Sequence, residues 1–368
     1  MKGKQMSKKT KEPDALACRR NKVGGQAVLE GVMMKSGERV CIAVRKPDGS
    51  IGKRTDSFVS VRKKHKILNI PILRGAINFV EMMKLSFSTL SKSGEMLGTE
   101  EEETKFEKWL REKFGKSIMV VIMPISIILA LALSVGLFFL LPTYATKGIE
   151  YLAGAPLDGW LKSIIEGVMK IIIFICYLLL VSLMPDIKRT FMYHGSEHKS
   201  IFCYEHGLPL TVENVRTQRR FHPRCGTSFM FVMILIGVLI GILIPWDWAN
   251  VDSKILSSLI RVGIKLLLLP LTCGVGYEFL MYAGKHDNAI VRILSAPGLW
   301  MQRITTKEPD DSMIEVAIAA LKGAMPEEFP EETTEDGTQA ETEAEEKPGD
   351  GNTSVDGETP IKDGEENA

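Results

Sequence analysis

Residues 118–141 read IMVVIMPISIILALALSVGLFFLL, a run of 24 residues without a charged side chain. About 20 apolar residues in a helix cross the hydrocarbon core of a bilayer, and that length distinguishes a membrane span from the core helix of a soluble protein. Three later segments are also long and largely apolar, namely residues 163–184, 226–244 and 259–282. We therefore expect an α-helical multi-pass membrane protein with about four transmembrane helices, which occupy a domain from residue 117 to residue 284.

Two of these spans contain charged side chains. Glu166 and Lys170 lie four residues apart in the second span, in the order that stabilises a helix. Arg261 and Lys265 occupy a similar depth in the fourth span. We favour a structural interpretation in which these charges neutralise one another, and a transport pathway lined by them is the alternative.

The loops between the spans differ in positive charge. Lys and Arg number two in residues 142–162, seven in residues 185–225 and one in residues 245–258. Positively charged loops stay on the cytoplasmic side of a membrane. We therefore expect a protein of the cytoplasmic membrane whose N-terminus, C-terminus and 185–225 loop are cytosolic. Its expected partners are the lipid bilayer and the anionic lipid headgroups of the inner leaflet, because these headgroups explain the basic loop more simply than nucleic acid does.

The formal net charge of +1 sums two opposed parts of the chain. From Met325 onward 16 acidic residues accompany only two lysines, a charge of −14, whereas residues 1–324 carry a charge of +15. Because the acidic segment has almost no large apolar residue, we predict a disordered acidic tail at residues 325–368. The other segments outside the membrane domain are a disordered basic N-terminus at 1–24, a small cytosolic β-rich unit at 25–66, an amphipathic helix with a charged linker at 67–116, and a cytosolic segment with a short helix at 285–324.

Residue patterns support two of these segments. Residues 39–45 and 51–61 are strand-like runs on either side of a Pro-Asp-Gly-Ser turn at residues 47–50. Polar residues recur at helical spacing among mostly apolar ones between residues 67 and 90. This pattern favours a helix that lies in the plane of the membrane or re-enters it, rather than a fifth span.

The 185–225 loop contains the string HGSEH, in which His194 and His198 are four residues apart. If the string is helical, both imidazoles lie on one face, about 6 Å apart at their side-chain origins, and can chelate one metal ion, for which we expect zinc. Glu197 lies beside them. In metallohydrolases with this order of residues, the carboxylate next to the histidine pair takes a proton from a metal-bound water, so Glu197 is the candidate catalytic residue.

Further candidate ligands surround this string, since four of the six histidines lie in the same loop. We expect a third metal ligand from Glu278, which lies near the cytosolic end of the last span, or from Glu213 or His222. The structural alternative for Glu278 is an ion pair with Arg292 or Lys285. The candidates for residues that support the ligands from a second layer are Gln26, Glu30, Glu205 and Cys225.

These residues support three hypotheses of different classes. The leading one is a membrane-embedded zinc-dependent hydrolase or peptidase that acts on a membrane-associated substrate. The second is a metal-ion or solute transporter, in which the histidine cluster loads the ion and the charges within the spans line its route. The third is a non-enzymatic membrane scaffold or regulator with a structural metal.

Five strings carry a resemblance to a known family. They are GGQAVLEGVMM at residues 24–34, HGSEHK at 194–199, LTVENVR at 210–216, HPRCGTSF at 222–229 and TTKEPDD at 305–311. Over residues 24–321 the chain resembles the YqhQ-like bacterial membrane proteins, grouped as the domain of unknown function DUF1385. The resemblance implies a multi-pass protein of the bacterial cytoplasmic membrane and supplies no catalytic assignment. In the first string, glycines allow close approach of another backbone, and the absence of a following Gly-Lys-Ser/Thr argues against nucleotide binding.

Overall fold

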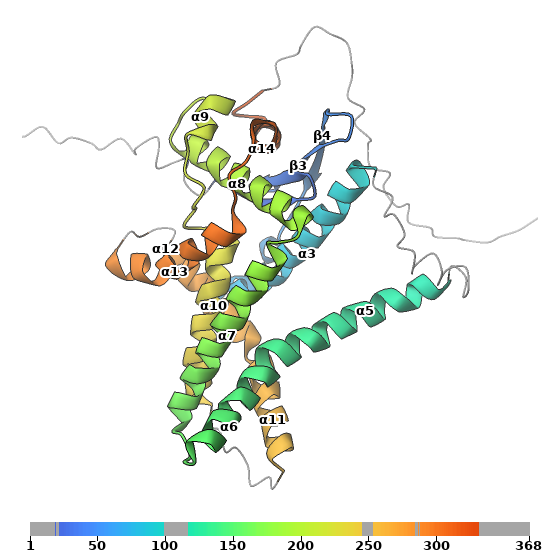
Figure 1. Ribbon diagram of the computed structural model, residues 1–368. Helices are drawn as coiled ribbons and strands as arrows, with labels where there is room; N and C mark the ends of the chain where they lie inside the picture. Colours follow the sequence, from blue (N-terminus) through green and yellow to red (C-terminus); the bar gives the residue numbers. More distant parts are fainter. Residues whose placement is uncertain are drawn as a thin grey trace, which may run out of the picture. The chain divides into compact units, whose positions relative to one another are not determined.

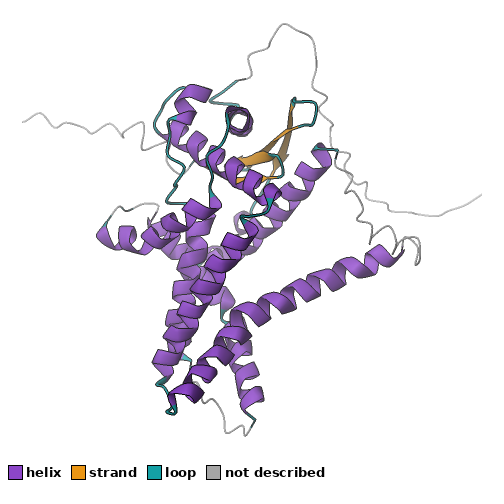
Figure 2. Ribbon diagram, viewed as in Figure 1, coloured by secondary structure: helices purple, strands orange, loops and turns teal. Residues whose placement is uncertain are grey.

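The computed structural model describes residues 19, 22–98, 117–244, 253–283, 286 and 288–330 (Figures 1 and 2). The predictions for the basic N-terminus up to residue 18, for the charged linker at residues 99–116 and for the acidic tail from residue 331 onward lie outside these residues.

Four strands near the N-terminus form one antiparallel sheet in the order β1-β2-β3-β4. The strands are β1 Val23–Val28, β2 Gly31–Ser36, β3 Arg39–Arg45 and β4 Ile51–Ser57. In the turn between β3 and β4, Gly49 has a φ of 85°, which favours glycine, and the carboxylate of Asp48 accepts a hydrogen bond from the backbone N–H of Ser50. The predicted β-rich unit is therefore confirmed as a small antiparallel sheet.

One face of the sheet packs against two helices from distant parts of the chain (Figure 1). These helices are α8, Pro185–Glu205, and α14, Asp311–Ala324. Together with the short helix α9, Val212–Arg216, they enclose a core of buried apolar side chains that includes Met34, Tyr193, Tyr204, Ile314 and Leu321. Three segments that were predicted to lie on one side of a membrane thus share a single hydrophobic core.

Side chains alternate between the two faces of the sheet along each strand, so the opposite face carries a second set of apolar side chains. That face packs against helix α3, Leu73–Met96. Val40, Ile42 and Val44 of β3 form one buried apolar cluster with Leu85 of α3 on this face. Two short turns, α2 Val61–Lys64 and the 3₁₀ helix η1 Lys66–Asn69, precede α3. Helix α3 corresponds to the amphipathic helix predicted between residues 67 and 90, and its outer side exposes large apolar side chains such as Phe79, Val80 and Phe87.

The remaining helices are mostly long and apolar. They are α5 Ser117–Val135, the π-helical turn η2 Gly136–Leu140, α6 Leu141–Ala153, α7 Gly159–Val181, α10 Gly226–Leu243, α11 Lys254–Leu267, α12 Leu269–Ala283 and α13 Ala289–Thr305. Within the described residues, three helical segments are long and apolar enough to cross a membrane, at Pro124–Ala153, Gly159–Val181 and Gly226–Leu243. Helices α11 and α12 together make a fourth such segment, which is bent by 41°.

The helices differ from the expected spans at two places, and a proline lies at each of them. The first span was expected to end at residue 141, yet the helix continues through η2 to Ala153. Pro142 in the first turn of α6 has no N–H to donate, and the π-helical turn lies directly before it. In the fourth span, Pro270 in the first turn of α12 cannot donate to the preceding helical turn, and the break between α11 and α12 lies at that point.

The start of the predicted acidic tail is part of the folded unit. Met325 is buried in the core beneath the sheet, and Phe329 packs against the same core. The hydroxyl of Tyr204 donates a hydrogen bond to the Glu328 carboxylate at 2.9 Å. Residues 325–330, which were predicted as part of the tail, therefore belong to the folded unit, because these apolar side chains extend the core of α14.

The charged side chains of the spans meet between α7 and α11. The Glu166 carboxylate, 2 % exposed, accepts hydrogen bonds from Lys265 and from the hydroxyl of Thr143, and a guanidinium nitrogen of Arg261 lies 3.7 Å from it. The carboxylate therefore pairs with cations of another helix. This arrangement agrees with the structural interpretation of these charges.

Candidate metal centre

Helix α8 carries the HGSEH string, and its local sequence explains its start. Pro185 occupies the first turn, where its missing N–H costs no hydrogen bond, and Asp186 places a negative charge at the positive end of the helix. The helix then continues to Glu205 without a break, so His194 and His198 lie on one face, one turn apart.

A glycine in the string allows a neighbouring segment to lie directly against α8. A Cβ atom on Gly195 would lie 2.0 Å from the carbonyl oxygen of Lys307, and the Lys307 N–H donates a hydrogen bond to the carbonyl of Phe191 at 2.8 Å. The segment that leaves α13 is thereby fixed against the helix beside His194.

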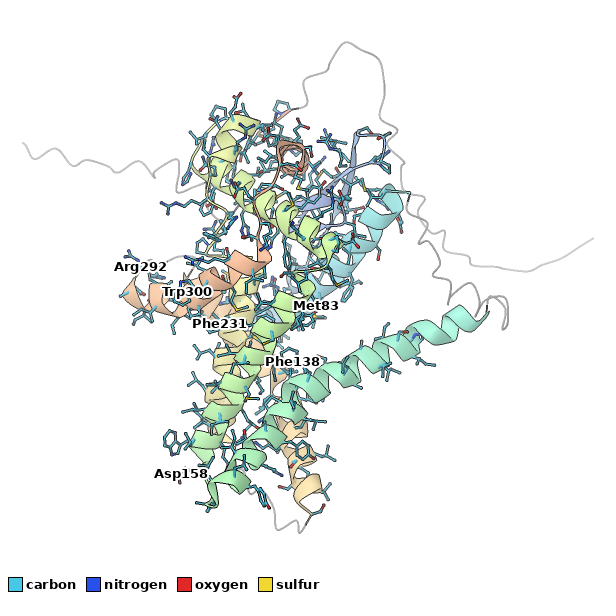
Figure 3. All side chains as sticks on the ribbon, viewed as in Figure 1. Met83, Phe138, Asp158, Phe231, Arg292 and Trp300 are labelled. Atoms are coloured by element: carbon cyan, nitrogen blue, oxygen red, sulfur yellow. The ribbon has the colours of Figure 1, made fainter. Side chains whose placement is uncertain are left out.

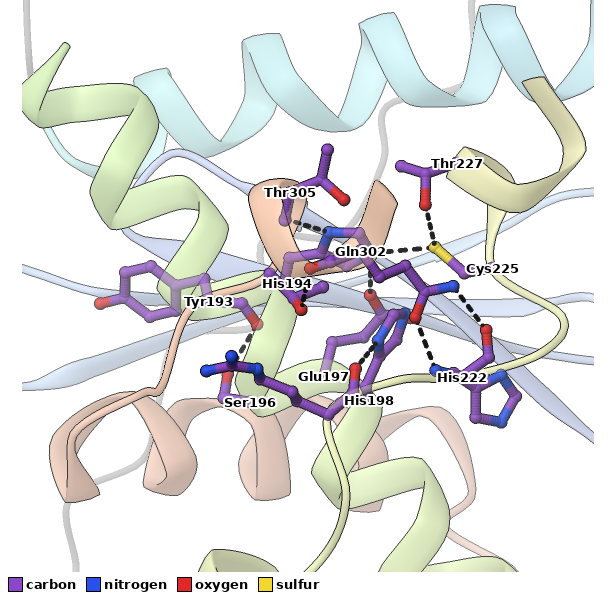
Figure 4. A network of polar contacts seen from close by, with 12 residues as sticks. Tyr193, His194, Ser196, Glu197, His198, His222, Cys225, Thr227, Gln302 and Thr305 are labelled. Atoms are coloured by element: carbon purple, nitrogen blue, oxygen red, sulfur yellow. Dashed lines mark hydrogen bonds and ion pairs between the residues drawn. The ribbon is translucent and has the colours of Figure 1, made fainter. Parts of the chain in front are cut away.

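Three side chains, His194, His198 and Cys225, form what we call the metal-site cluster. One ligand atom from each lies within 4.8 Å of the other two. The Nε2 atom of His194 is 3.2 Å from the Sγ atom of Cys225, and the two imidazole rings are 4.4 Å apart at their centroids (Figure 4). His198 is 2 % exposed and Cys225 is 8 % exposed, so both are buried, whereas His194 is partly exposed. Cys225 lies immediately before α10, one of the candidate spans.

Backbone carbonyl groups orient both imidazoles. The Nδ1 atom of His194 lies 2.9 Å from the carbonyl oxygen of Thr305, and Nδ1 of His198 is hydrogen-bonded to the carbonyl oxygen of Arg220 (Figure 4). Because a carbonyl oxygen can only accept, each Nδ1 must carry the proton, which leaves the lone pair on Nε2. Histidines that bind metals in proteins are commonly held in this way.

The distances are compatible with one metal ion. Zinc lies about 2.0–2.1 Å from histidine nitrogen and about 2.3 Å from cysteine sulfur, and tetrahedral geometry then separates the nitrogen and sulfur atoms by roughly 3.5 Å. The observed 3.2 Å between His194 Nε2 and Cys225 Sγ requires only a small expansion. Two nitrogen donors and one thiol also suit zinc better than they suit magnesium or calcium, which prefer oxygen.

Glu197 lies between α8 and strand β1, beside the cluster. Its side chain is 6 % exposed, and its Oε2 atom is 3.8 Å from Nε2 of His194. Burial raises the pKa of this carboxyl to about 7, and the charge of His194 opposes the increase. A Cβ atom on Gly25 of β1 would lie 2.8 Å from both Cγ and Oε1 of Glu197. The glycine-rich string therefore has two kinds of close neighbour: this carboxylate at Gly25, and the backbone of β3 at Gly31, where a Cβ atom would lie 2.2 Å from the carbonyl oxygen of Ala43.

His222 belongs to the layer around the cluster. Its ring centroid is 5.5 Å from that of His198, while its Nε2 atom lies 3.8 Å from the carboxylate of Glu205. Its backbone N–H donates to the side-chain oxygen of Gln302 at 2.7 Å, and Gln302 donates in return to the carbonyl of His222 (Figure 4). Burial lowers the pKa of His222 to about 4, so the imidazole is neutral near pH 7. Glu205 also accepts a hydrogen bond from Arg224.

Glu278 and Glu213, the other two candidates for the third metal ligand, do not belong to the metal-site cluster. Glu278 forms a two-point ion pair with Arg74 of α3, at 2.6 Å and 2.5 Å. It is thus a structural ion-pair partner, as the alternative interpretation proposed, and Arg74 is a partner that the interpretation did not name. Lys285 lies outside the described residues. Glu213 is exposed on α9. The structure brings Cys225, expected only as a supporting residue, into the third position.

The expected supporting residues of the N-terminal sheet lie near α8. Glu30, at a φ of 47° in the turn after β1, pairs with Arg189 and accepts a hydrogen bond from the hydroxyl of Tyr193 at 3.3 Å. Gln26 lies in β1 opposite Met33. Glu30 therefore contacts α8, and neither Glu30 nor Gln26 provides an atom of the metal-site cluster.

This arrangement can support hydrolytic chemistry. Among the described residues three donors form the cluster, and the fourth position of a tetrahedral site stays available for a water molecule or a substrate. A buried carboxylate lies beside that position. Nothing in the sequence marks the carbonyl groups of Thr305 and Arg220 as supports of the imidazoles, because every residue has a carbonyl group.

Comparisons with known proteins agree on one family. The family model described as protein of unknown function DUF1385 matches residues 70–327. A curated relative, the uncharacterized protein YqhQ of Bacillus subtilis (strain 168), is 36 % identical over 305 residues, which cover 80 % of this chain and 89 % of that protein. No solved structure matches the chain. With its helical bundle, its small sheet and these two matches, the chain belongs to the DUF1385 family.

Proposed function

We propose that this protein is a multi-pass membrane protein that binds zinc through His194, His198 and Cys225 and hydrolyses a membrane-associated substrate. The observation that carries the proposal is the orientation of the two histidines. Both Nδ1 atoms are engaged by backbone carbonyls, and the Nε2 atom of His194 lies 3.2 Å from the buried thiol of Cys225.

Membrane insertion is supported by the composition and exposure of the helices. Three described segments, and a fourth if the bent pair is counted, have the length and hydropathy of spans. Their large apolar side chains are widely exposed, for example Ile128 at 66 % and Leu133 at 70 %. Exposure of this extent is costly in water and favourable in lipid. We infer that α8 and the sheet lie on the cytosolic side, because the 185–225 segment has seven Lys and Arg residues.

A zinc ion at this site would supply Lewis acidity to a water molecule or to a substrate carbonyl. Glu197, whose Oε2 atom is 3.8 Å from Nε2 of His194, would take the proton of the attacking water and return it to the leaving group. The carbonyls of Thr305 and Arg220 keep the imidazoles fixed while this happens. The substrate is associated with the membrane because Cys225 lies at the end of a candidate span, α10.

A structural zinc site, the scaffold hypothesis, has the weaker support. Structural sites normally use four protein ligands, whereas the described residues supply three. Transport through the spans also has weaker support, because Glu166 pairs with Lys265 and Arg261.

The first experiment measures bound zinc in the purified full-length protein by mass spectrometry. We expect about one zinc per chain in the parent, and loss of the metal in His198→Ala and in Cys225→Ala. The control is His206→Ala, since His206 lies at the end of the same helix, is exposed, and interacts with Gln218 rather than with the cluster. Full zinc in Cys225→Ala, or no zinc in a folded parent, would contradict the assignment of the ligands.

The second experiment tests hydrolysis. The zinc-loaded protein in lipid nanodiscs is incubated with p-nitrophenyl acyl esters and with a set of fluorogenic peptides. We expect turnover of one probe class by the parent and at least a hundredfold loss in Glu197→Gln, which retains its zinc. Equal turnover in Glu197→Gln would remove Glu197 as the base, and no turnover of either class by zinc-loaded parent would favour a structural metal.

A further inference from the structure

A cavity of about 210 Å³ lies among the apolar helices and shares no lining residue with the metal-site cluster. It is bounded by the π-helical turn η2 and by α7, α10, α11 and α12. Its walls are mainly apolar, and they include Phe138, Phe139, Ile234, Ile240 and Leu268. Phe138 is labelled on the helical bundle in Figure 3. A cavity with such walls favours alkyl chains over hydrated ions.

Two lysines interrupt these apolar walls, and their surroundings differ. Lys265 donates to the Glu166 carboxylate, so its charge has a counter-ion. The ammonium of Lys170 lies over the ring of Phe139, 5.1 Å from its centroid. Among the described residues no carboxylate lies within ion-pair distance of Lys170, whose neighbour Glu166 is already engaged by Lys265, Arg261 and Thr143.

An ammonium group among apolar helices is costly unless an anion or water accompanies it. The contact with Phe139 offsets part of that cost, because a cation over an aromatic face gains about 0.5–2 kcal/mol. A negatively charged group at the cavity would offset more of it. Lys170 and the apolar walls together therefore match a ligand that has an anionic group on an alkyl chain.

We propose that this cavity binds an anionic lipid, whose carboxylate or phosphate pairs with Lys170 and whose alkyl chain lies against the apolar walls. The inference goes beyond the hydrolytic function and does not depend on zinc. Besides the cavity and Lys170, it requires only that these helices lie in a membrane, where such lipids are present.

A glycine of the cavity wall provides a second way to test the site. Gly237 of α10 lines the cavity, and a Cβ atom added to it would meet no other atom within 4 Å. The first carbon of a leucine side chain at position 237 therefore meets no backbone or side chain, the rest of it is directed at the cavity wall that Gly237 lines, and leucine is also the better helix former. The substitution should reduce the space for an alkyl chain while Lys170 is left in place.

The experiment is a calorimetric titration of the purified full-length protein, in a neutral maltoside detergent, with dodecyl phosphate. Dodecylphosphocholine has the same chain with a compensating positive charge, and inorganic phosphate has the charge without the chain. We expect saturable binding of dodecyl phosphate at one site. We expect it to weaken at least about tenfold in Lys170→Gln, the factor of one lost charge-assisted hydrogen bond, and to weaken similarly in Gly237→Leu.

The matched control is Lys162→Gln, because Lys162 lies on the same helix, outside the cavity lining, in an ion pair with Glu150. Binding should be unchanged in this variant, and also in His198→Ala, which separates the lipid site from the zinc site. Equal affinity for dodecylphosphocholine, equal affinity for inorganic phosphate, or unchanged binding in Lys170→Gln or Gly237→Leu would overturn the proposal.

Discussion

The substitution Gly195→Ala should separate α8 from the segment that holds His194 in place. The added Cβ would lie 2.0 Å from the carbonyl oxygen of Lys307, whereas carbon and oxygen atoms in contact are roughly 3.3–3.6 Å apart. The segment must therefore move by more than about 1 Å. That movement lengthens two hydrogen bonds, from Lys307 N–H to the Phe191 carbonyl and from His194 Nδ1 to the Thr305 carbonyl.

The size of the effect follows from these two hydrogen bonds. The loss of each hydrogen bond lowers the free energy of unfolding by about 1–2 kcal/mol when the groups are buried, so we expect the variant to be less stable by roughly 2–4 kcal/mol. The midpoint of thermal unfolding, followed by intrinsic fluorescence in detergent, should fall by about 5–15 °C. Zinc affinity should fall about tenfold or more, because the imidazole of His194 loses the carbonyl that orients it.

The control for this prediction is Gly263→Ala. Gly263 also lies within a helix, but a Cβ atom added there would meet nothing within 4 Å. Alanine is the better helix former, so this variant should be as stable as the parent or slightly more stable. If Gly195→Ala unfolds at the same temperature as Gly263→Ala and binds zinc normally, the close packing of α8 against Lys307 is refuted.

Three further predictions address other contacts. Gly25→Ala, whose Cβ would lie 2.8 Å from Glu197, should retain zinc by mass spectrometry but lower turnover about tenfold, and unchanged turnover would mean that the carboxylate position is not critical. Arg74→Met should lower the thermal unfolding midpoint by a few degrees without changing zinc content, whereas zinc loss would return Glu278 to the list of ligands. The Lys22 ammonium and the Tyr204 hydroxyl lower the pKa of Glu328, so this contact should stabilise the fold above the ordinary glutamate pKa and be lost as the pH falls through the lowered value. Unfolding midpoints measured from pH 7 to pH 3 should therefore decline more in the parent than in Glu328→Gln, and parallel curves would contradict this contribution.

The elements with local signals could be predicted from the sequence. Uncharged runs marked the apolar helices, strand-like residues around a Pro-Asp-Gly-Ser turn marked the sheet, and the spacing of His194 and His198 marked the candidate site. Each of these signals depends on residues within one or two dozen positions of one another, which is the range over which helical and strand periodicity acts.

The parts that depend on long-range contacts could not be predicted. The sheet, α8 and α14 share one core although more than a hundred residues separate each from the next in the sequence, and no local pattern encodes that pairing. Glu278 lies near the end of its apolar helix, as expected, but its carboxylate forms an ion pair with Arg74 of α3 rather than reaching the metal-site cluster. Cys225 was among the candidates because it follows His222 closely, yet only the path of the chain at the start of α10 brings its thiol to His194.

The coordination of zinc can be measured directly by X-ray absorption at the zinc edge of the purified, zinc-loaded protein. We predict one sulfur at about 2.3 Å, two histidine nitrogens at about 2.0–2.1 Å and one further light atom, with the sulfur contribution lost in a Cys225→His variant. A shell of nitrogen and oxygen atoms without sulfur, or a sulfur signal that persists in Cys225→His, would contradict the metal-site cluster as the zinc-binding site.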